Sequence, residues 1–148
     1  MRLLLLALVA SGLYGQTVSQ DSVTEFMGRK VTITEAETDA RGFPKGPATL
    51  CLEGPPHRQC FTEPGDFGVG PAATSVELNK GMFALLFSAT SPGADGSVDR
   101  LALLHPGEGS DLEDLFRGGV PISNFGDYAF WVEPFGSEVP IFVTADYV

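Results

Sequence analysis

Basic residues are scarce in this chain. Lys and Arg together number 9 against 19 Asp and Glu, and the formal net charge is -10 at pH 7. A surface of this sign repels phosphate backbones and anionic lipid headgroups, so nucleic-acid binding and attachment to anionic membranes are disfavoured. The excess of acids is explained most simply by solubility, and its alternative use is coordination of a hard cation such as calcium.

The signatures of common catalysts are also missing. The sequence contains no Gly-x-Ser-x-Gly elbow, no His-Glu-x-x-His pair, no phosphate-binding Gly-rich loop with its Lys and no Cys-His zinc spacing. His57 stands in a Pro-Pro turn and His105 precedes Pro106, and neither position suggests a Ser-His-Asp triad. We therefore expect a non-enzymatic protein.

A pair of carboxylates remains the one route to catalysis that the composition offers. Two carboxylates at a suitable separation hydrolyse glycosides, so a small secreted glycoside hydrolase is the alternative prediction. The candidate acids are Glu108, Asp111, Glu113, Asp114, Asp127 and Glu133.

Long hydrophobic runs are absent, since no apolar stretch approaches the roughly 20 residues of a membrane-spanning helix. A basic start is followed by an apolar run over residues 3–10 and then by small residues, which is the order of a secretory signal peptide. We predict a signal peptide over residues 1–15, with cleavage after Gly15 or Gly12. Residues 16–148 then form one secreted or periplasmic domain without a membrane anchor.

The chain has 2 cysteines, Cys51 and Cys60. In an oxidising compartment an even pair so close in sequence is expected to form a structural disulfide. Apolar residues flank each cysteine and a Gly-Pro-Pro sequence lies between them, which predicts a hairpin of residues 48–52 and 59–62.

Glycine and proline are abundant, with 18 and 11 residues, and they separate short β-prone runs. Alternation of apolar and polar residues in these runs is typical of half-buried strands, and the more uniformly apolar residues 82–89 are expected to form a central strand. The sequence thus predicts a mainly β fold, an antiparallel β-sandwich or a small barrel. Its expected strands lie at residues 30–37, 48–52, 59–62, 75–78, 82–89, 98–104, 128–133 and 139–147.

One segment departs from the β pattern. Ser110 and Glu113 have the spacing of a helix capping box, and Gly118 follows as a stop signal. The apolar residues Leu112, Leu115 and Phe116 follow the i, i+3, i+4 spacing of a helix. We predict one short helix near residues 110–117.

Two groups of residues are candidate binding sites. Asp95 and Asp99, with Ser97 between them, place oxygen-bearing side chains at alternate positions, as in calcium loops, although an Asp-Gly turn explains the same residues. Trp131, Tyr128 and Phe135 form an aromatic cluster that either packs in the core or stacks on a carbohydrate or a protein partner.

The predicted function is therefore that of an exported binding or structural β domain, with calcium as its candidate cofactor and a carbohydrate or a protein as its candidate partner. The apolar last strand suggests a third role, a strand-exchanging assembly subunit, which an open sheet edge would support.

Overall fold

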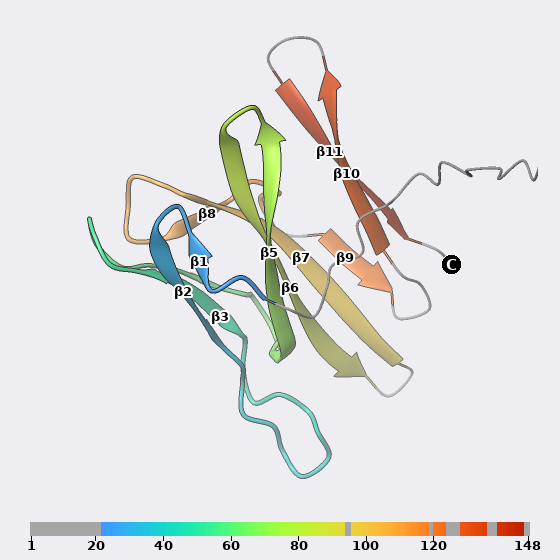
Figure 1. The fold of residues 1–148 in the computed structure, drawn as a ribbon. Coiled ribbons are helices and arrows are strands. Elements are labelled where there is room, and N and C mark those ends of the chain that lie inside the picture. Colours follow the sequence, from blue (N-terminus) through green and yellow to red (C-terminus); the bar gives the residue numbers. More distant parts are fainter. Residues whose placement is uncertain (1–21, 94–95, 119, 124–127, 136–138, 147–148) are drawn as a thin grey trace, which may run out of the picture.

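The computed structural model of the chain describes residues 22–93, 96–118, 120–123, 128–135 and 139–146, with side chains described up to residue 118. These residues form strands and turns and contain no helix (Figure 1). The prediction of a mainly β, antiparallel fold is confirmed. In the same part of the chain, no helix is long and apolar enough to cross a membrane.

The first sheet has four strands in the order β1-β2-β3-β4, all antiparallel. Its strands are short, and turns join β1 to β2 and β3 to β4, while a longer loop joins β2 to β3. The strands are β1 (Glu25–Phe26), β2 (Arg29–Thr34), β3 (Thr49–Glu53) and β4 (Gln59–Thr62).

The second sheet has five strands in the order β5-β6-β7-β8, with β9 also paired to β7. Two further strands, β10 and β11, form a separate hairpin that contacts β5 and lies beside it in Figure 1. The strands are β5 (Val69–Asn79), β6 (Met82–Gly93), β7 (Gly96–Pro106), β8 (Leu112–Asp114), β9 (Val120–Ser123), β10 (Tyr128–Phe135) and β11 (Val139–Asp146).

Strand β6 is the centre of the core, as its uniformly apolar sequence predicts. Leu85 and Phe87 point into the apolar cluster shared with the first sheet, while Ala84 and Leu86 belong to a second cluster on the opposite face. Alternate side chains of a strand lie on opposite faces, so a strand buried on both faces must be apolar throughout.

The two sheets are joined at both edges. On one side, the N–H of Cys60 donates to the carbonyl oxygen of Ser110 at 3.2 Å. On the other, the N–H of Val23 donates to the carbonyl oxygen of Ala73 at 3.0 Å, and that of Ala36 to Gly68 at 2.9 Å. These bonds link the two sheets of the sandwich near their edges.

The helix predicted near residues 110–117 is wrong. Leu112–Asp114 forms β8, which pairs with the edge of β7 through His105 and Glu113 among others. Leu112 is buried in the core between the sheets. A helix of two turns is marginal by itself, whereas pairing with β7 satisfies backbone groups of both segments.

A turn built on Asp114 replaces the expected helical turns after β8. The Asp114 carboxylate accepts the N–H of Phe116 at 3.0 Å and that of Gly118 at 3.0 Å. It also accepts the N–H of Leu103 at 3.2 Å, which ties the turn to β7. The acid therefore caps a turn rather than a helix.

Candidate functional site

The predicted disulfide is present. Cys51 and Cys60 face each other on β3 and β4, with their sulfur atoms 2.12 Å apart. Such a cross-link is consistent with an oxidising compartment, either extracellular or periplasmic. It also holds together the two strands that carry the turn of residues 54–58.

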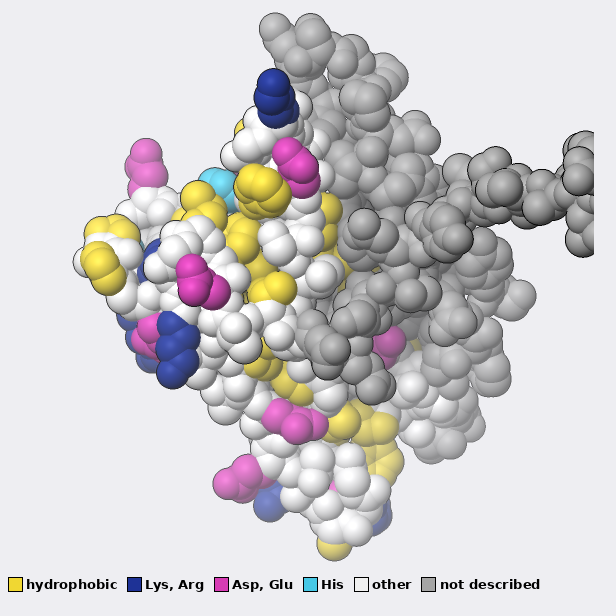
Figure 2. Space-filling model, in the orientation of Figure 1, with side chains coloured by type: hydrophobic (Ala, Val, Ile, Leu, Met, Phe, Trp, Pro, Cys, Tyr) yellow, Lys and Arg dark blue, Asp and Glu magenta, His cyan; other side chains and the backbone are white. Residues whose placement is uncertain are grey.

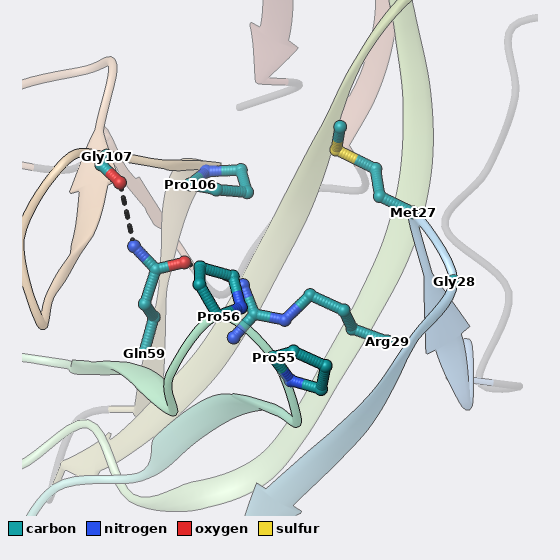
Figure 3. Close-up of a pocket in the computed structure, with 8 residues that line it drawn as sticks. All are labelled: Met27, Gly28, Arg29, Pro55, Pro56, Gln59, Pro106 and Gly107. Carbon is teal, nitrogen blue, oxygen red and sulfur yellow. Dashed lines mark hydrogen bonds between the residues drawn. The ribbon is translucent and has the colours of Figure 1, made fainter.

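That turn meets two others around a hollow of about 420 Å³, here called the three-turn hollow (Figure 3). Its volume falls in the range of roughly 300–1,000 Å³ that ligand pockets occupy. The lining consists of Met27, Gly28 and Arg29 at the β1–β2 turn, Pro55, Pro56 and Gln59 around the β3–β4 turn, and Pro106 and Gly107 at the end of β7.

Arg29 fixes one side of the hollow. Its Nη1 donates to Oε1 of Gln59 at 2.7 Å, and its Nη2 donates to the carbonyl oxygens of Leu52 at 2.8 Å and His57 at 2.5 Å. The guanidinium group therefore joins β2 to β3, to β4 and to the turn between them through three hydrogen bonds. Bonds donated by a charged group are stronger than neutral ones, so this connection is rigid.

Gln59 extends the network to the third turn. Its side chain is buried, and Nε2 donates to the carbonyl oxygens of Gly107 at 2.8 Å and Gly109 at 2.9 Å. Nε2 of His57 donates to the same Gly109 oxygen at 2.8 Å. The hollow is thus assembled from three segments far apart in the sequence and held by polar contacts beneath an apolar rim.

A second hollow, of about 380 Å³, lies where β4 and β8 diverge. Its lining is Cys60, Phe61, Thr62, Asp111 and Leu112. Among the acids considered for glycoside hydrolysis, Asp111 lines this hollow, whereas Asp114 serves the turn after β8. The side chains of Asp127 and Glu133 lie outside the described residues.

Glu63 is the most perturbed acid that the structure describes. It directly follows β4, its exposed fraction is 0%, and its Oε1 lies 2.7 Å from Nε of Arg100 on β7. Burial raises the pKa of Glu63 to about 7, the charge of Arg100 acts in the opposite direction, and the Asp114 carboxylate raises it further. Because the group is enclosed by the core, it cannot touch a substrate, and we assign it a structural role between the sheets.

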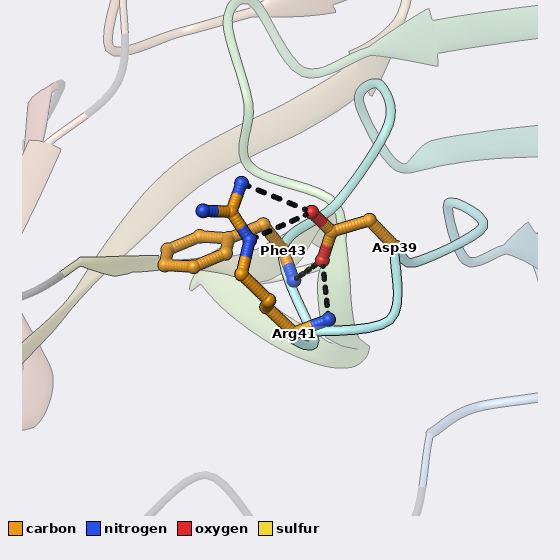
Figure 4. A network of polar contacts seen from close by, with 3 residues as sticks. All are labelled: Asp39, Arg41 and Phe43. Carbon is orange, nitrogen blue, oxygen red and sulfur yellow. Dashed lines mark hydrogen bonds and ion pairs between the residues drawn. The ribbon is translucent and has the colours of Figure 1, made fainter.

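The loop between β2 and β3 carries an ordered exposed cluster (Figure 4). Oδ1 of Asp39 accepts the N–H groups of Arg41 and Phe43, each at 2.9 Å, and the Arg41 guanidinium carbon lies 5.4 Å from the centre of the Phe43 ring. Hydrogen bonds from the backbone of Phe43 and then of Arg41 lower the pKa of Asp39. These contacts close residues 39–43 into a hydrogen-bonded turn.

The predicted calcium site is only partly described. Asp95 lies outside the described residues, and Oδ1 of Asp99 accepts the hydroxyl of Thr90 at 2.5 Å. Elsewhere in the described chain, no group of three or more His, Cys, Asp or Glu side chains could hold a metal ion. Acidic side chains are scattered over the face seen in Figure 2. Calcium at Asp95 and Asp99 stays a prediction.

The aromatic cluster cannot be placed side chain by side chain. Tyr128, Trp131 and Phe135 all belong to β10, and Trp131 pairs in register with Val143 of β11. Their side chains lie outside the described part of the structure, so their role in binding stays a prediction.

Strand β5 is an end strand of the second sheet, and part of its outer side is already bonded to residues 22 and 23. The N–H of Ala73 bonds to Oγ of Ser22 at 3.1 Å, away from β6. Alternate residues of a strand direct their backbone groups to the same side, so Ser75 and Glu77 face outward too. This outward stretch is short, and the exposed carboxylate of Glu77 opposes pairing with another strand.

Comparisons with models of protein families, with curated proteins and with solved structures found no match to this chain. The chemistry of its own residues is what indicates a function. The sequence did not reveal Arg29, Gln59 or Glu63, because their partners lie 23 or more residues away in the chain. The turn at Asp39 could have been predicted, because an Asp side chain commonly accepts a hydrogen bond from the backbone N–H two residues later.

Proposed function

We propose that this chain is an exported, non-enzymatic β domain that binds a segment of another protein in the three-turn hollow. The observation that carries the proposal is the rim of the hollow. Met27 is 63% exposed there and stands with Pro55, Pro56 and Pro106 around a fixed guanidinium group. Methionine and arginine are enriched at protein interfaces.

The hollow is prepared for binding before any partner arrives. The contacts of Arg29 and Gln59 connect its three turns, and the Cys51–Cys60 disulfide joins the strands on either side of one of them. A site that is already ordered loses little conformational entropy when it binds, which favours affinity.

A protein is a better occupant than a carbohydrate. Sugar rings stack on aromatic faces, and the lining of the three-turn hollow consists of proline, methionine, glycine, glutamine and arginine. These residues suit an aliphatic side chain with a carbonyl or carboxylate group. Export is supported by the leader-like first 15 residues together with the disulfide.

The test selects peptides on the purified, disulfide-bonded chain from a random display library. Binding of the selected peptides is then measured on Met27→Ala and on the matched control Met82→Ala. Met82 is 48% exposed and lies outside the lining of the hollow. Truncating an interface side chain that matters lowers affinity by about tenfold or more.

We expect Met27→Ala to weaken the selected peptides by that factor and Met82→Ala to leave them unchanged. A library that yields no binders, or binders insensitive to Met27→Ala, would contradict the proposal.

A further inference from the structure

The charge of Arg29 sets it apart from other arginines of the chain. Arg41, Arg58 and Arg100 each have a carboxylate oxygen within 3.4 Å. Within the described part of the chain, Arg29 donates to neutral oxygens, those of one side-chain amide and two backbone carbonyls. In a chain of net charge -10, the three-turn hollow is therefore lined by a cation whose hydrogen-bond partners carry no negative charge.

The guanidinium group also has N–H groups that make no hydrogen bond to the described residues. Of its five N–H bonds, three are used by Gln59, Leu52 and His57. Nε is buried without an acceptor among the residues described, and Nη1 makes one of its two possible bonds. A negatively charged acceptor at Nη1 would gain a charge-assisted hydrogen bond and would balance the charge.

Nothing in the lining opposes such an acceptor, because no Asp or Glu is part of it. In Figure 3 the guanidinium group lies beside Pro56, with Met27 and Pro106 farther along the rim. An occupant that reaches the guanidinium with a carboxylate therefore places its neighbouring atoms against apolar groups.

We propose that the three-turn hollow captures the C-terminal residue of a partner protein, with its carboxylate on Arg29 and an aliphatic side chain against Met27 and the prolines. This inference rests on the proposed function and names its ligand. A terminal residue carries both groups on one Cα. At about 420 Å³ the hollow suits a chain end better than a long segment passing through.

The experiment compares two probes that differ only in the carboxylate, N-acetyl-L-leucine and N-acetyl-L-leucinamide. Each is titrated into the ¹⁵N-labelled, disulfide-bonded chain, and NMR shifts are followed at the amides of Gly28 and Gly107 and at Nε–H of Arg29. Ligands this small bind with Kd on the order of 1 mM when they fit well. We expect the acid to bind about tenfold more tightly than the amide, because only the acid brings a negative charge to the hydrogen bond with the guanidinium group.

Variants separate the apolar contact from the charged one. Arg29 is part of the network that holds the turns, so its replacement could disturb the fold, and Met27→Ala is used instead. Met27→Ala should weaken both probes by the same factor and leave the acid-to-amide ratio unchanged. Met82→Ala should change neither.

A third probe, acetyl-Leu-Glu-amide, carries its carboxylate on a side chain. If it binds more tightly than N-acetyl-L-leucine, C-terminal capture is overturned in favour of an internal acid. Equal binding of acid and amide overturns the role of the carboxylate while the hollow remains a binding site. No shift with any probe also overturns the inference, and the peptide selection then decides separately whether the hollow binds protein at all.

Discussion

Raising the pH from about 5 to about 8 should destabilise the folded domain through one buried carboxyl group, that of Glu63. Its pKa is raised from 4.5 to about 7 in the folded chain, chiefly by burial. Between these values the folded state holds a proton that the unfolded state has released. Stability from this group is therefore fully present below about pH 4.5 and is lost as the pH rises through about 7.

The size of the effect follows from the shift. A difference of 7 − 4.5, or 2.5 units, at about 1.36 kcal/mol per unit corresponds to about 3 kcal/mol. For a domain of this length, 3 kcal/mol corresponds to a change in Tm on the order of 10 °C. The loss arises because the ionised carboxylate must stay in the core with Oε2 lacking a hydrogen-bond partner among the described residues.

The assay is urea unfolding of the natural chain and of Glu63→Gln at several pH values between about 5 and 8. Other groups also titrate, so the informative quantity is the difference between the two proteins at each pH. We expect this difference to change by about 2.5 kcal/mol across the range, because a part of the effect is already lost at pH 5. Glu25→Gln is the control, because Glu25 is exposed on β1. The stability of this variant should depend on pH in the same way as that of the natural chain.

Parallel pH profiles for the natural chain and Glu63→Gln would refute the reasoning. They would mean that Glu63 stays ionised throughout, with the attraction of Arg100 at 2.7 Å outweighing the effect of burial.

Two further changes test the packing of the sandwich. A Cβ at Gly68 would overlap the carbonyl oxygen of Gly46, so Gly68→Ala should lower the free energy of unfolding by about 1–3 kcal/mol in urea. Gly46→Ala, with nothing within 4 Å of its new Cβ, should change it little, and equal effects of the two would contradict the overlap. Replacing both Cys51 and Cys60 by Ser should lower the free energy of unfolding in urea by about 2–3 kcal/mol, because the disulfide restricts the unfolded chain. An unchanged urea midpoint would contradict a stabilising role of the disulfide.

The strands and the disulfide hairpin could be predicted because they depend on short-range pattern. The alternation of apolar and polar residues in β2 indicates burial on one face, and the apolar run in β6 indicates burial on both faces. Cys51 and Cys60 are close enough in sequence to meet in one hairpin. The prediction of a helix near residues 110–117 was wrong because it also used only the spacing of nearby residues. That spacing carries no information on pairing with β7. In the folded chain, the edge of β7 forms backbone hydrogen bonds with Leu112–Asp114, and these residues are therefore a strand.

The candidate site could not be predicted, because each of its contacts joins segments remote in sequence. Arg29 reaches Gln59, and Gln59 reaches Gly107, over 30 and 48 residues of chain. No periodicity or spacing encodes such a meeting, which depends on how the two sheets close on each other.

The sequence by itself thus determined the β character of the chain, its acidic charge and its disulfide, all of which are properties of composition or of neighbouring residues. Only the tertiary structure decided that a cation would line an apolar hollow and that Glu63 would be enclosed beside Arg100. Burial and long-range pairing exist only after the sheets have packed, and these alone determine which polar groups are left without an acidic partner or without water.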